Sequence, residues 1–240
     1  MKGIAEIPPN RATFATRAVV AALSGLALVL ASLPVRSTEP TNDVLRAWLA
    51  VQSTITNWSA DFVQTRTFKS VARPLVSTGH VWFARPNAFR WELGRPVQTL
   101  AVRDADELRV LYPRLRREER YDLAAGRSGV LGEALGLLDA GFPRDAADFA
   151  DRFRLLALTP VGGAWHLDLQ PASAAARRVM PGVRLVLDSE YTLVANEIAF
   201  PDGSRIRNDF SAVVANAPLP PDIFRPPTTA EYRIVHPATR

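Results

Sequence analysis

The sequence predicts a mainly β protein with a few helices, of the α+β class, built on an antiparallel sheet that curves toward a barrel. Three features predict it. Short segments that alternate apolar and polar residues recur from residue 61 to residue 210, with turn signals between them. Most consecutive segments have no helix-length pattern between them, which favours hairpins over crossover connections. One turn, Pro-Asp-Gly-Ser at 201–204, is a clear hairpin signal.

The expected strands are short, and residues typical of turns separate them. In the first of them, Phe62, Gln64 and Arg66 fall on one face, because side chains alternate along a strand. The expected strands are 61–69, 77–84, 88–93, 97–103, 107–112, 115–123, 152–159, 165–170, 183–188, 193–200 and 205–210.

Three segments have helical spacing instead. The first is 41–58, and Asp43 lies in its first turn, where a carboxylate is favourable. The second is 130–139, in which leucines recur at spacings of four and three, and the third is 145–151. We expect the Ala-rich segment 170–181 to be a loop.

The N-terminus has the pattern of a secretory signal peptide. Lys2, Arg11 and Arg17 make a positive region, an apolar run follows, and small residues end it. An uncleaved membrane anchor is the alternative, but it needs about 20 apolar residues, and this run is shorter. We therefore expect residues 1–31 to be removed on export and residues 32–240 to form a single domain in the periplasm.

The composition excludes several classes of protein. Cysteine is absent, which excludes disulfides, thiol catalysis and a lipid-bearing N-terminal cysteine. The formal net charge is +5, but 27 of the 29 basic residues are arginines, since Lys2 and Lys69 are the only lysines. In the densest charged run, one face alternates in sign from Arg116 to Asp122. A solvated ladder between strands has this pattern and a nucleic-acid site does not, so we expect no nucleic-acid partner.

The sequence contains no recognisable catalytic or metal-binding arrangement. Its three histidines are scattered and have no ligand spacing, and we expect His80 to be a surface or hydrogen-bonded residue. Asp145, Asp148 and Asp151 share one helix face, which we expect to be solvated. There is no nucleophile elbow or phosphate loop. We expect no enzyme activity, no metal and no cofactor.

An ordered series of motifs between residues 58 and 227 resembles the LolA family, periplasmic carriers that move lipoproteins from the inner to the outer membrane of Gram-negative bacteria. The family pattern begins with a Phe-x-Gln strand, continues through an Arg-Pro-x-x-Phe-Arg-Trp run and ends with Phe-x-Pro-Pro. This sequence has Asp-Ala-Asp where the family has an Asp-Gly turn. The matching motifs are Phe62-Val63-Gln64, Gly79-His80-Val81-Trp82-Phe83, Arg85-Pro86-Asn87-Ala88-Phe89-Arg90-Trp91, Pro96-Val97-Gln98, Asp104-Ala105-Asp106, Leu111-Tyr112-Pro113 and Phe224-Arg225-Pro226-Pro227.

The resemblance implies an incomplete antiparallel β-barrel whose open side is covered by an α-helical lid, with an apolar cavity between them. The ligand would be the acyl chains of lipoproteins or another lipid. The implied partners are an inner-membrane ABC-type releasing complex and an outer-membrane receptor, and we expect the carrier to be a monomer. The alternative is a non-transferring lipid-binding or sensor module of the envelope with the same fold.

Apolar strand residues in the matching region are candidates to line the cavity, and the sequence leaves open which face of each strand points inward. Arg85 stands where the family has an arginine that holds the lid shut through hydrogen bonds to lid carbonyls. A guanidinium suits this role because it offers five donors, and the last carbonyls of a helix lack partners. The other interpretation of Arg85 is a surface arginine before a turn. The candidate lining residues are Phe62, Val81, Phe83, Phe89, Trp91, Leu93, Leu100, Val102, Leu108 and Val110.

Overall fold

The chain divides into two compact units, Met1–Ser37 and Thr38–Arg240. Every residue described below belongs to the second unit. The computed structural model describes residues 40–104, 107–123, 141–227 and 230–237.

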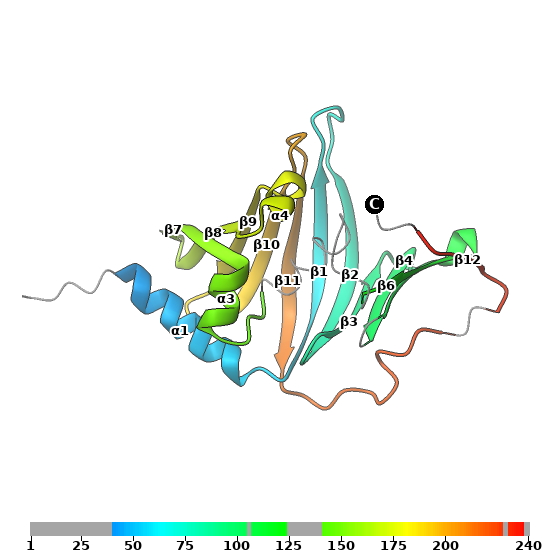
Figure 1. Cartoon of the computed structure of the whole chain (residues 1–240), viewed down its shortest axis with the longest axis horizontal. Coiled ribbons are helices and arrows are strands. Elements are labelled where there is room, and N and C mark those ends of the chain that lie inside the picture. The colour runs from blue at the N-terminus through cyan, green and yellow to red at the C-terminus, as the bar shows by residue number, and fades with distance from the viewer. Residues whose placement is uncertain (1–39, 105–106, 124–140, 228–229, 238–240) are drawn as a thin grey trace, which may run out of the picture. The chain divides into compact units, whose positions relative to one another are not determined.

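The described residues form a single open sheet of twelve strands (Figure 1). In chain order these are β1 (Asn57–Thr67), β2 (Leu75–Ala84), β3 (Ala88–Leu93), β4 (Thr99–Asp104), β5 (Glu107–Tyr112), β6 (Arg117–Asp122), β7 (Phe153–Val161), β8 (Ala164–Pro171), β9 (Gly182–Leu187), β10 (Leu193–Ala199), β11 (Arg205–Ala215) and β12 (Arg233–Val235). Across the sheet the order is β12-β6-β5-β4-β3-β2-β1-β11-β10-β9-β8-β7. All neighbours are antiparallel except β12 and β6, and the end strands β7 and β12 do not pair. The predicted α+β class with an incomplete antiparallel barrel is confirmed.

The described helices are α1 (Pro40–Thr54), α3 (Ala146–Arg152) and α4 (Ala174–Val179), and a 3₁₀ turn spans Pro113–Leu115. Figure 1 shows α1 and α3 together at the end of the sheet formed by β7 to β10. The ring of Trp48 in α1 meets the ring of Phe149 in α3 edge-on, with centroids 5.6 Å apart. Trp48 has no exposed surface, so the apolar stripe of α1 faces the core.

Two sequence predictions of secondary structure need correction. The first helix ends at Thr54, before the predicted end at Trp58, because Trp58 is already in β1 and turns its ring into the core. The predicted loop at 170–181 contains α4, whose N-terminus is capped by Ser173: its hydroxyl accepts from an amide of the first turn.

Most other predicted elements agree with the structure. β3 and β5 have the predicted bounds, and the predicted helix at 145–151 is α3, shifted by one residue. The hairpin turn at 201–204 joins β10 to β11, and Gly203 adopts φ 79° there, which glycine tolerates best. β12 was not predicted. The predicted helix at 130–139 lies outside the described residues.

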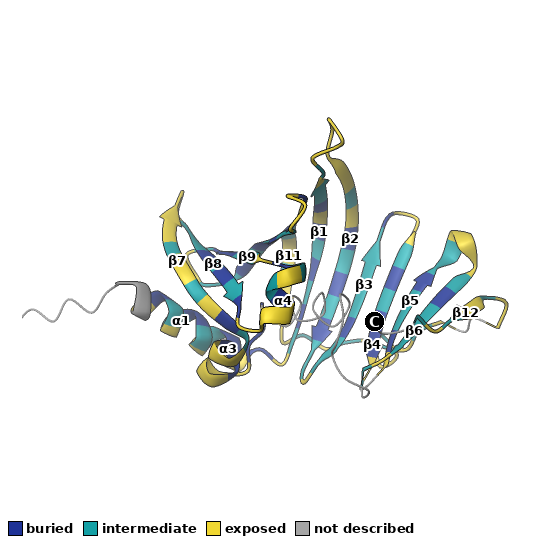
Figure 2. Cartoon of the chain, turned by 45° about the horizontal axis from the view of Figure 1, so that its top comes forward, coloured by how far each residue is buried: buried dark blue, intermediate teal, exposed yellow. Residues whose placement is uncertain are grey.

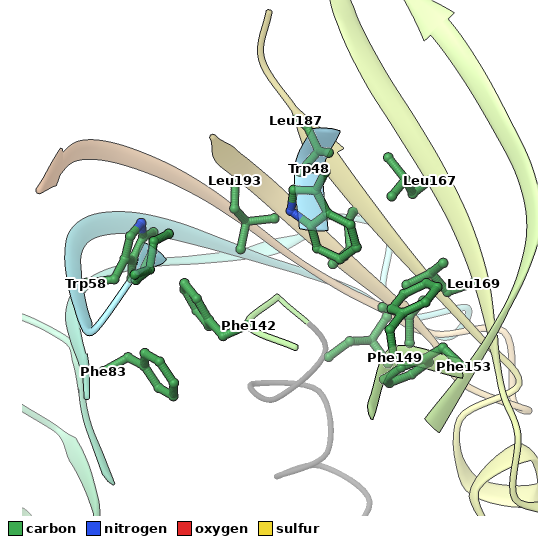
Figure 3. Packing of buried hydrophobic residues seen from close by; sticks show 14 of the residues in the cluster. Trp48, Trp58, Phe83, Phe142, Phe149, Phe153, Leu167, Leu169, Leu187 and Leu193 are labelled. Atoms are coloured by element: carbon green, nitrogen blue, oxygen red, sulfur yellow. The ribbon is translucent and has the colours of Figure 1, made fainter. Parts of the chain in front are cut away.

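One face of the sheet, called the inner face here, carries the main apolar core (Figure 3). Figure 2 shows the buried residues along the strands. Directly paired residues point to the same face, and the pairs Trp58–Phe83 and Ala60–Val81 of β1 and β2 lie on it. Aromatic side chains from α1 and α3 complete this core. Its buried members are Trp48, Ile55, Trp58, Ala60, Phe62, Val81, Phe83, Phe142, Phe149, Phe153, Leu167, Leu169, Met180, Val183, Leu185, Leu187, Leu193 and Ile198.

The opposite, outer face is largely polar. Charged side chains of neighbouring strands pair across it, as in the contact of 2.6 Å between Arg184 Nε and Asp168 Oδ1. It is apolar where the C-terminal segment packs on β4 and β5. The apolar residues gathered there are Leu100, Val102 and Leu111, with Val97, Phe224 and Tyr232 packed against them.

The charged face of β6 is not fully solvated, which corrects the sequence prediction. Glu118 has no exposed surface, and it accepts hydrogen bonds of 2.6 Å from Arg109 Nε and from Arg120 Nε. Burial is possible because guanidinium groups of its own and the adjacent strand neutralise the carboxylate. The alternating signs on this face therefore form internal ion pairs.

Gly79 in β2 lies where the sheet has no room for a side chain. A Cβ at Gly79 would collide with the ring of Phe62 and with the carbonyl oxygen of Glu92. We expect Gly79→Ala to lower the free energy of unfolding by about 1–3 kcal/mol, the usual range for overpacking, as measured by urea denaturation. Gly182→Ala in β9 is the matched control, because a Cβ there meets no atom within 4 Å. Equal losses in the two variants would contradict the steric explanation.

Candidate functional site

Eight of the ten predicted lining residues lie on the inner face. The other two, Leu100 and Val102, lie on the outer face: Leu100 pairs with Leu111, and both pack under the C-terminal segment. Side chains alternate along β4, so these two cannot line a cavity on the inner face, and the prediction was wrong for them. The eight on the inner face are Phe62, Val81, Phe83, Phe89, Trp91, Leu93, Leu108 and Val110.

A small apolar cavity lies among the inner-face side chains. Its volume is about 10 Å³, which is barely the room that one water molecule needs. An acyl chain cannot occupy it unless the lining moves apart. The residues around it are Trp58, Val81, Phe83, Phe89, Trp91, Gly141, Phe142, Leu193, Asn196 and Phe210.

Phe142 fills the space next to the cavity. Its ring stacks on Phe83, with centroids 4.4 Å apart and planes 13° apart, and it lies 5.1 Å from the ring of Trp58 (Figure 3). Phe142 belongs to the segment that leads into α3, not to a strand. It can therefore withdraw without breaking any pairing of the sheet.

A larger groove, called the α1 groove here, runs beside the closed cavity. Its volume is about 400 Å³, which is within the usual range for ligand sites. Trp58, Phe142 and Leu193 line both spaces, so these three side chains separate them. The remaining lining of the groove comes from the end of α1, the turn between β9 and β10, and the end of β11: Val51, Gln52, Thr54, Ile55, Asp188, Thr192, Val213, Ala215 and Asn216.

Arg85 follows the last residue of β2 and binds three backbone carbonyls. Its Nε donates to Ile55 O at 2.6 Å, and its Nη2 donates to Gln52 O at 2.8 Å and to Pro143 O at 3.1 Å. The first two acceptors lie at the C-terminal end of α1, and the third lies next to Phe142. Arg85 thus joins β2 to the end of α1, which lines the α1 groove, and to the segment that carries Phe142. This arginine and its three acceptors are called the latch below.

The environment of Arg85 leaves its charge intact. Burial lowers the pKa of Arg85, while the nearby Asp148 opposes this effect and Arg144 adds to it. A guanidinium nevertheless stays protonated in proteins. The latch geometry is what a lid-closing role requires, and the role itself stays a prediction.

Two amide side chains strengthen the same junction. Gln52 is buried, and in the orientation that satisfies its neighbours it donates to Gly141 O at 3.1 Å and accepts from Trp48 Nε1 at 3.0 Å. Asn216, at the end of β11, donates to Thr54 O at 3.0 Å and accepts from the amide of Thr56 at 2.7 Å. The C-terminal end of α1 is therefore tied to the sheet as well as to the segment that carries Phe142.

Asp148 in α3 is buried, which corrects the prediction of a solvated aspartate face. It accepts from the amide of Arg144 at 3.0 Å and from the side chains of Arg144 and Arg152 at 2.9 Å and 2.7 Å. Burial alone would raise the pKa of Asp148, but the hydrogen bonds from Arg144 and the charges of Arg152 and Arg144 outweigh it and lower the pKa. Asp145 and Asp151 are exposed, as predicted.

Sequence reasoning missed six of the residues around the cavity, among them Gly141, which precedes Phe142. Trp58 was assigned to a helix, and Phe142 belongs to no predicted element. Phe210 carried a usable signal, because it lies in a predicted strand and its spacing of two puts it on the same face as Asn208. Leu193 and Asn196 both face the cavity only because a bulge interrupts the pairing between positions 193 and 195.

The described residues show no other recognisable chemical centre. No group of three or more histidine, aspartate or glutamate side chains within them could hold a metal ion. His80, as predicted, is hydrogen-bonded: its Nδ1 lies 2.9 Å from Asp61 Oδ1. No described helix is both long and apolar enough to span a membrane.

Comparisons with known proteins identify relatives of this chain. Residues 53–227 match the family described as outer membrane lipoprotein carrier protein LolA. An outer-membrane lipoprotein carrier protein of Methylibium petroleiphilum is 34% identical over 194 residues, which cover 79% of this chain and 87% of the relative. Another from Bordetella avium is 25% identical over 206 residues, covering 85% and 91%. A solved structure of a LolA superfamily protein from Nitrosomonas europaea matches with a TM-score of 0.41 at 12% identity, over 77% of this chain and 97% of that chain.

Proposed function

The chain belongs to the LolA family of outer membrane lipoprotein carrier proteins, and from this membership we propose that it binds the acyl chains of lipoproteins and carries them from the inner to the outer membrane. We further propose that residues 1–31 are a signal peptide and that residues 32–240 work in the periplasm as a monomer without enzyme activity. An inner-membrane ABC-type complex would load this carrier and an outer-membrane receptor would unload it.

One observation carries the proposal. An apolar cavity on the inner face is partly covered by a segment outside the sheet, and the latch binds that segment and α1 together. Opening the latch would release Phe142 and join the closed cavity to the α1 groove, since the two spaces share the walls that Phe142 helps to form. The joined space would then be lined mainly by aromatic and aliphatic side chains.

The energetics explain why a carrier needs such a closed state. Each buried methylene contributes about 0.8 kcal/mol, so a chain of roughly 15 methylenes gains about 12 kcal/mol before any opposing term. A lipoprotein with two or three such chains would be bound too tightly to release. A closed empty state that buries the same apolar surface offsets part of this gain. Phe142, packed between Phe83 and Trp58, supplies such competing burial.

Purification of the protein from the periplasm tests the proposal. Mass spectrometry should find a chain that begins near Ser32 and lipoprotein or other lipid bound to it. An apolar fluorescent probe should bind the lipid-free protein and be displaced by lipoprotein. A carrier should also pass bound lipoprotein to a purified receptor, whereas a non-transferring sensor module of the same fold would only bind it. Absence of probe binding would refute the cavity, and an intact N-terminus would refute the signal peptide.

A further inference from the structure

The cavity lining holds one carboxamide, and that carboxamide ends a line of polar side chains across the inner face. Apart from the indole groups of its tryptophans, Asn196 contributes the only polar side chain among the described residues around the cavity. Asn208 in β11 and Gln64 in β1 are its successive cross-strand neighbours, since Asn196 pairs with Asn208 and Asn208 pairs with Gln64. All three are buried, and Asn196 is 8% exposed.

Hydrogen bonds run through this line in one direction. Arg66 Nε donates to Gln64 Oε1 at 2.8 Å, Gln64 Nε2 donates to Asn208 Oδ1 at 3.0 Å, and Asn208 Nδ2 donates to Asn196 Oδ1 at 2.8 Å. The direction is set at the Arg66 end, because a guanidinium can only donate. Each carboxamide must therefore accept on the side toward Arg66 and donate on the side toward the cavity.

The last donor of the line has no acceptor. Within the part of the chain that the structure describes, Asn196 Nδ2 makes no hydrogen bond, although its residue is more than nine-tenths buried. Asn196 Nδ2 is not among the fully buried unpaired atoms of the described residues, so water can reach it in the empty protein, and a ligand that brings an acceptor can take the place of that water. A donor held in a fixed orientation at the wall of an apolar cavity is suited to a ligand that brings an acceptor.

We propose that Asn196 Nδ2 donates to the carbonyl oxygen of the ester or amide that joins an acyl chain to its head group. This inference rests on the proposed function and adds the chemical group that the cavity recognises. The carbonyl would lie at β10, and the chain would extend along the inner face toward Phe89 and Trp91 in β3, on the far side of the cavity. The site would thus favour acyl chains over alkyl chains of equal length.

Matched ligands test the inference. A glycerol monododecanoate and a glycerol monododecyl ether differ mainly in the carbonyl, and an N-dodecanoyl aminopropanediol replaces the ester by an amide. Wild-type protein should bind the ester or the amide about 3- to 10-fold more tightly than the ether, the range expected for one net hydrogen bond. The tighter of the two carbonyl ligands then identifies the linkage that the site prefers. Binding is measured by displacement of an apolar fluorescent probe.

Asn196→Leu removes the donor at similar side-chain volume and should abolish this preference, so that the variant binds the ester and the ether with equal affinity. Arg66→Met changes the half-buried far end of the line and leaves Asn196 in place. Without the guanidinium donor, the carboxamide groups can rotate so that their oxygen and nitrogen atoms exchange places. The preference for the carbonyl ligands should then fall at least about twofold. This second variant keeps the test open if Asn196→Leu does not fold. Equal binding of ester and ether by wild type, or an unchanged preference in either variant, would overturn this inference and leave the proposed function standing. Failure of wild type to bind any of the three ligands would overturn the proposed function with it.

Discussion

Replacement of Arg85 by leucine is expected to slow the transfer of bound lipoprotein to an acceptor by about tenfold or more. Arg85 makes three charge-assisted hydrogen bonds, and all of them hold α1 and the segment next to Phe142 in the closed arrangement. If together they contribute about 2 kcal/mol to closure, their loss favours the open state about 30-fold. The leucine variant should therefore load normally and retain its cargo.

The measurement is the rate at which lipoprotein passes from the purified, loaded carrier to its receptor. Arg85→Lys should give an intermediate rate, because an ammonium keeps the charge but cannot reproduce the planar set of donors. Arg46→Leu is the matched control: Arg46 lies on α1, is 71% exposed and pairs with the exposed Asp43. Transfer by Arg85→Leu at the wild-type rate would show that Arg85 is an ordinary structural arginine.

The affinity of Arg85→Leu for an apolar probe should not fall, although its rate of lipoprotein transfer does. Since the closed state competes with the ligand, weaker closure leaves more of the empty Arg85→Leu protein ready to bind. Its affinity for an apolar fluorescent probe should be equal to or higher than that of wild type. A large loss of probe affinity in this variant would mean that Arg85 shapes the cavity itself, and the proposed competition between closure and binding would then be wrong.

Strand positions could be predicted from the sequence where alternation and turn residues coincide. β3 and β5 lie between clear turn signals, and their bounds were predicted correctly. The first helix was predicted too long because helical apolar spacing continues past Ile55 to Trp58, although the ring of Trp58 packs as a strand residue against Phe210. Local spacing cannot distinguish these two outcomes when tertiary packing decides between them.

The candidate site depended on information that a single sequence does not contain. Alternation groups Leu100 with Val102, but it does not say which face of β4 is the inner face and which lies under the C-terminal segment. Asn196, Asn208 and Gln64 come together only through the sheet order β1-β11-β10, in which strands distant in the chain are neighbours. Arg85 was found through its motif, whereas its carbonyl acceptors follow from where α1 ends and where Phe142 packs.

The second large expected effect is a loss of folding stability when Asp148 is replaced. Asp148 stabilises the start of α3, the helix that follows the segment of Phe142 and Pro143. Its carboxylate accepts from the backbone of Arg144 and from the side chains of Arg144 and Arg152. Asp148→Asn keeps the shape of the side chain, but its amide group would turn a donor toward groups that can only donate. We expect the free energy of unfolding to fall by about 2–3 kcal/mol, as for the loss of a buried acceptor of charged hydrogen bonds.

This effect of Asp148→Asn should depend on pH in a defined direction. The pKa of Asp148 in the folded protein lies below its ordinary value of 3.8, so protons bind more readily to the unfolded chain. The stabilisation is complete above about pH 5 and is lost as the pH falls through the folded-state pKa. Urea denaturation at pH 7, 5 and 3 should show a constant gap between wild type and variant at the two higher values and a smaller gap at pH 3. Asp43→Asn, whose carboxylate is 54% exposed, should change stability by less than about 0.5 kcal/mol throughout. A gap for Asp148→Asn that persists undiminished at pH 3 would mean that the charge of Asp148 does not stabilise α3.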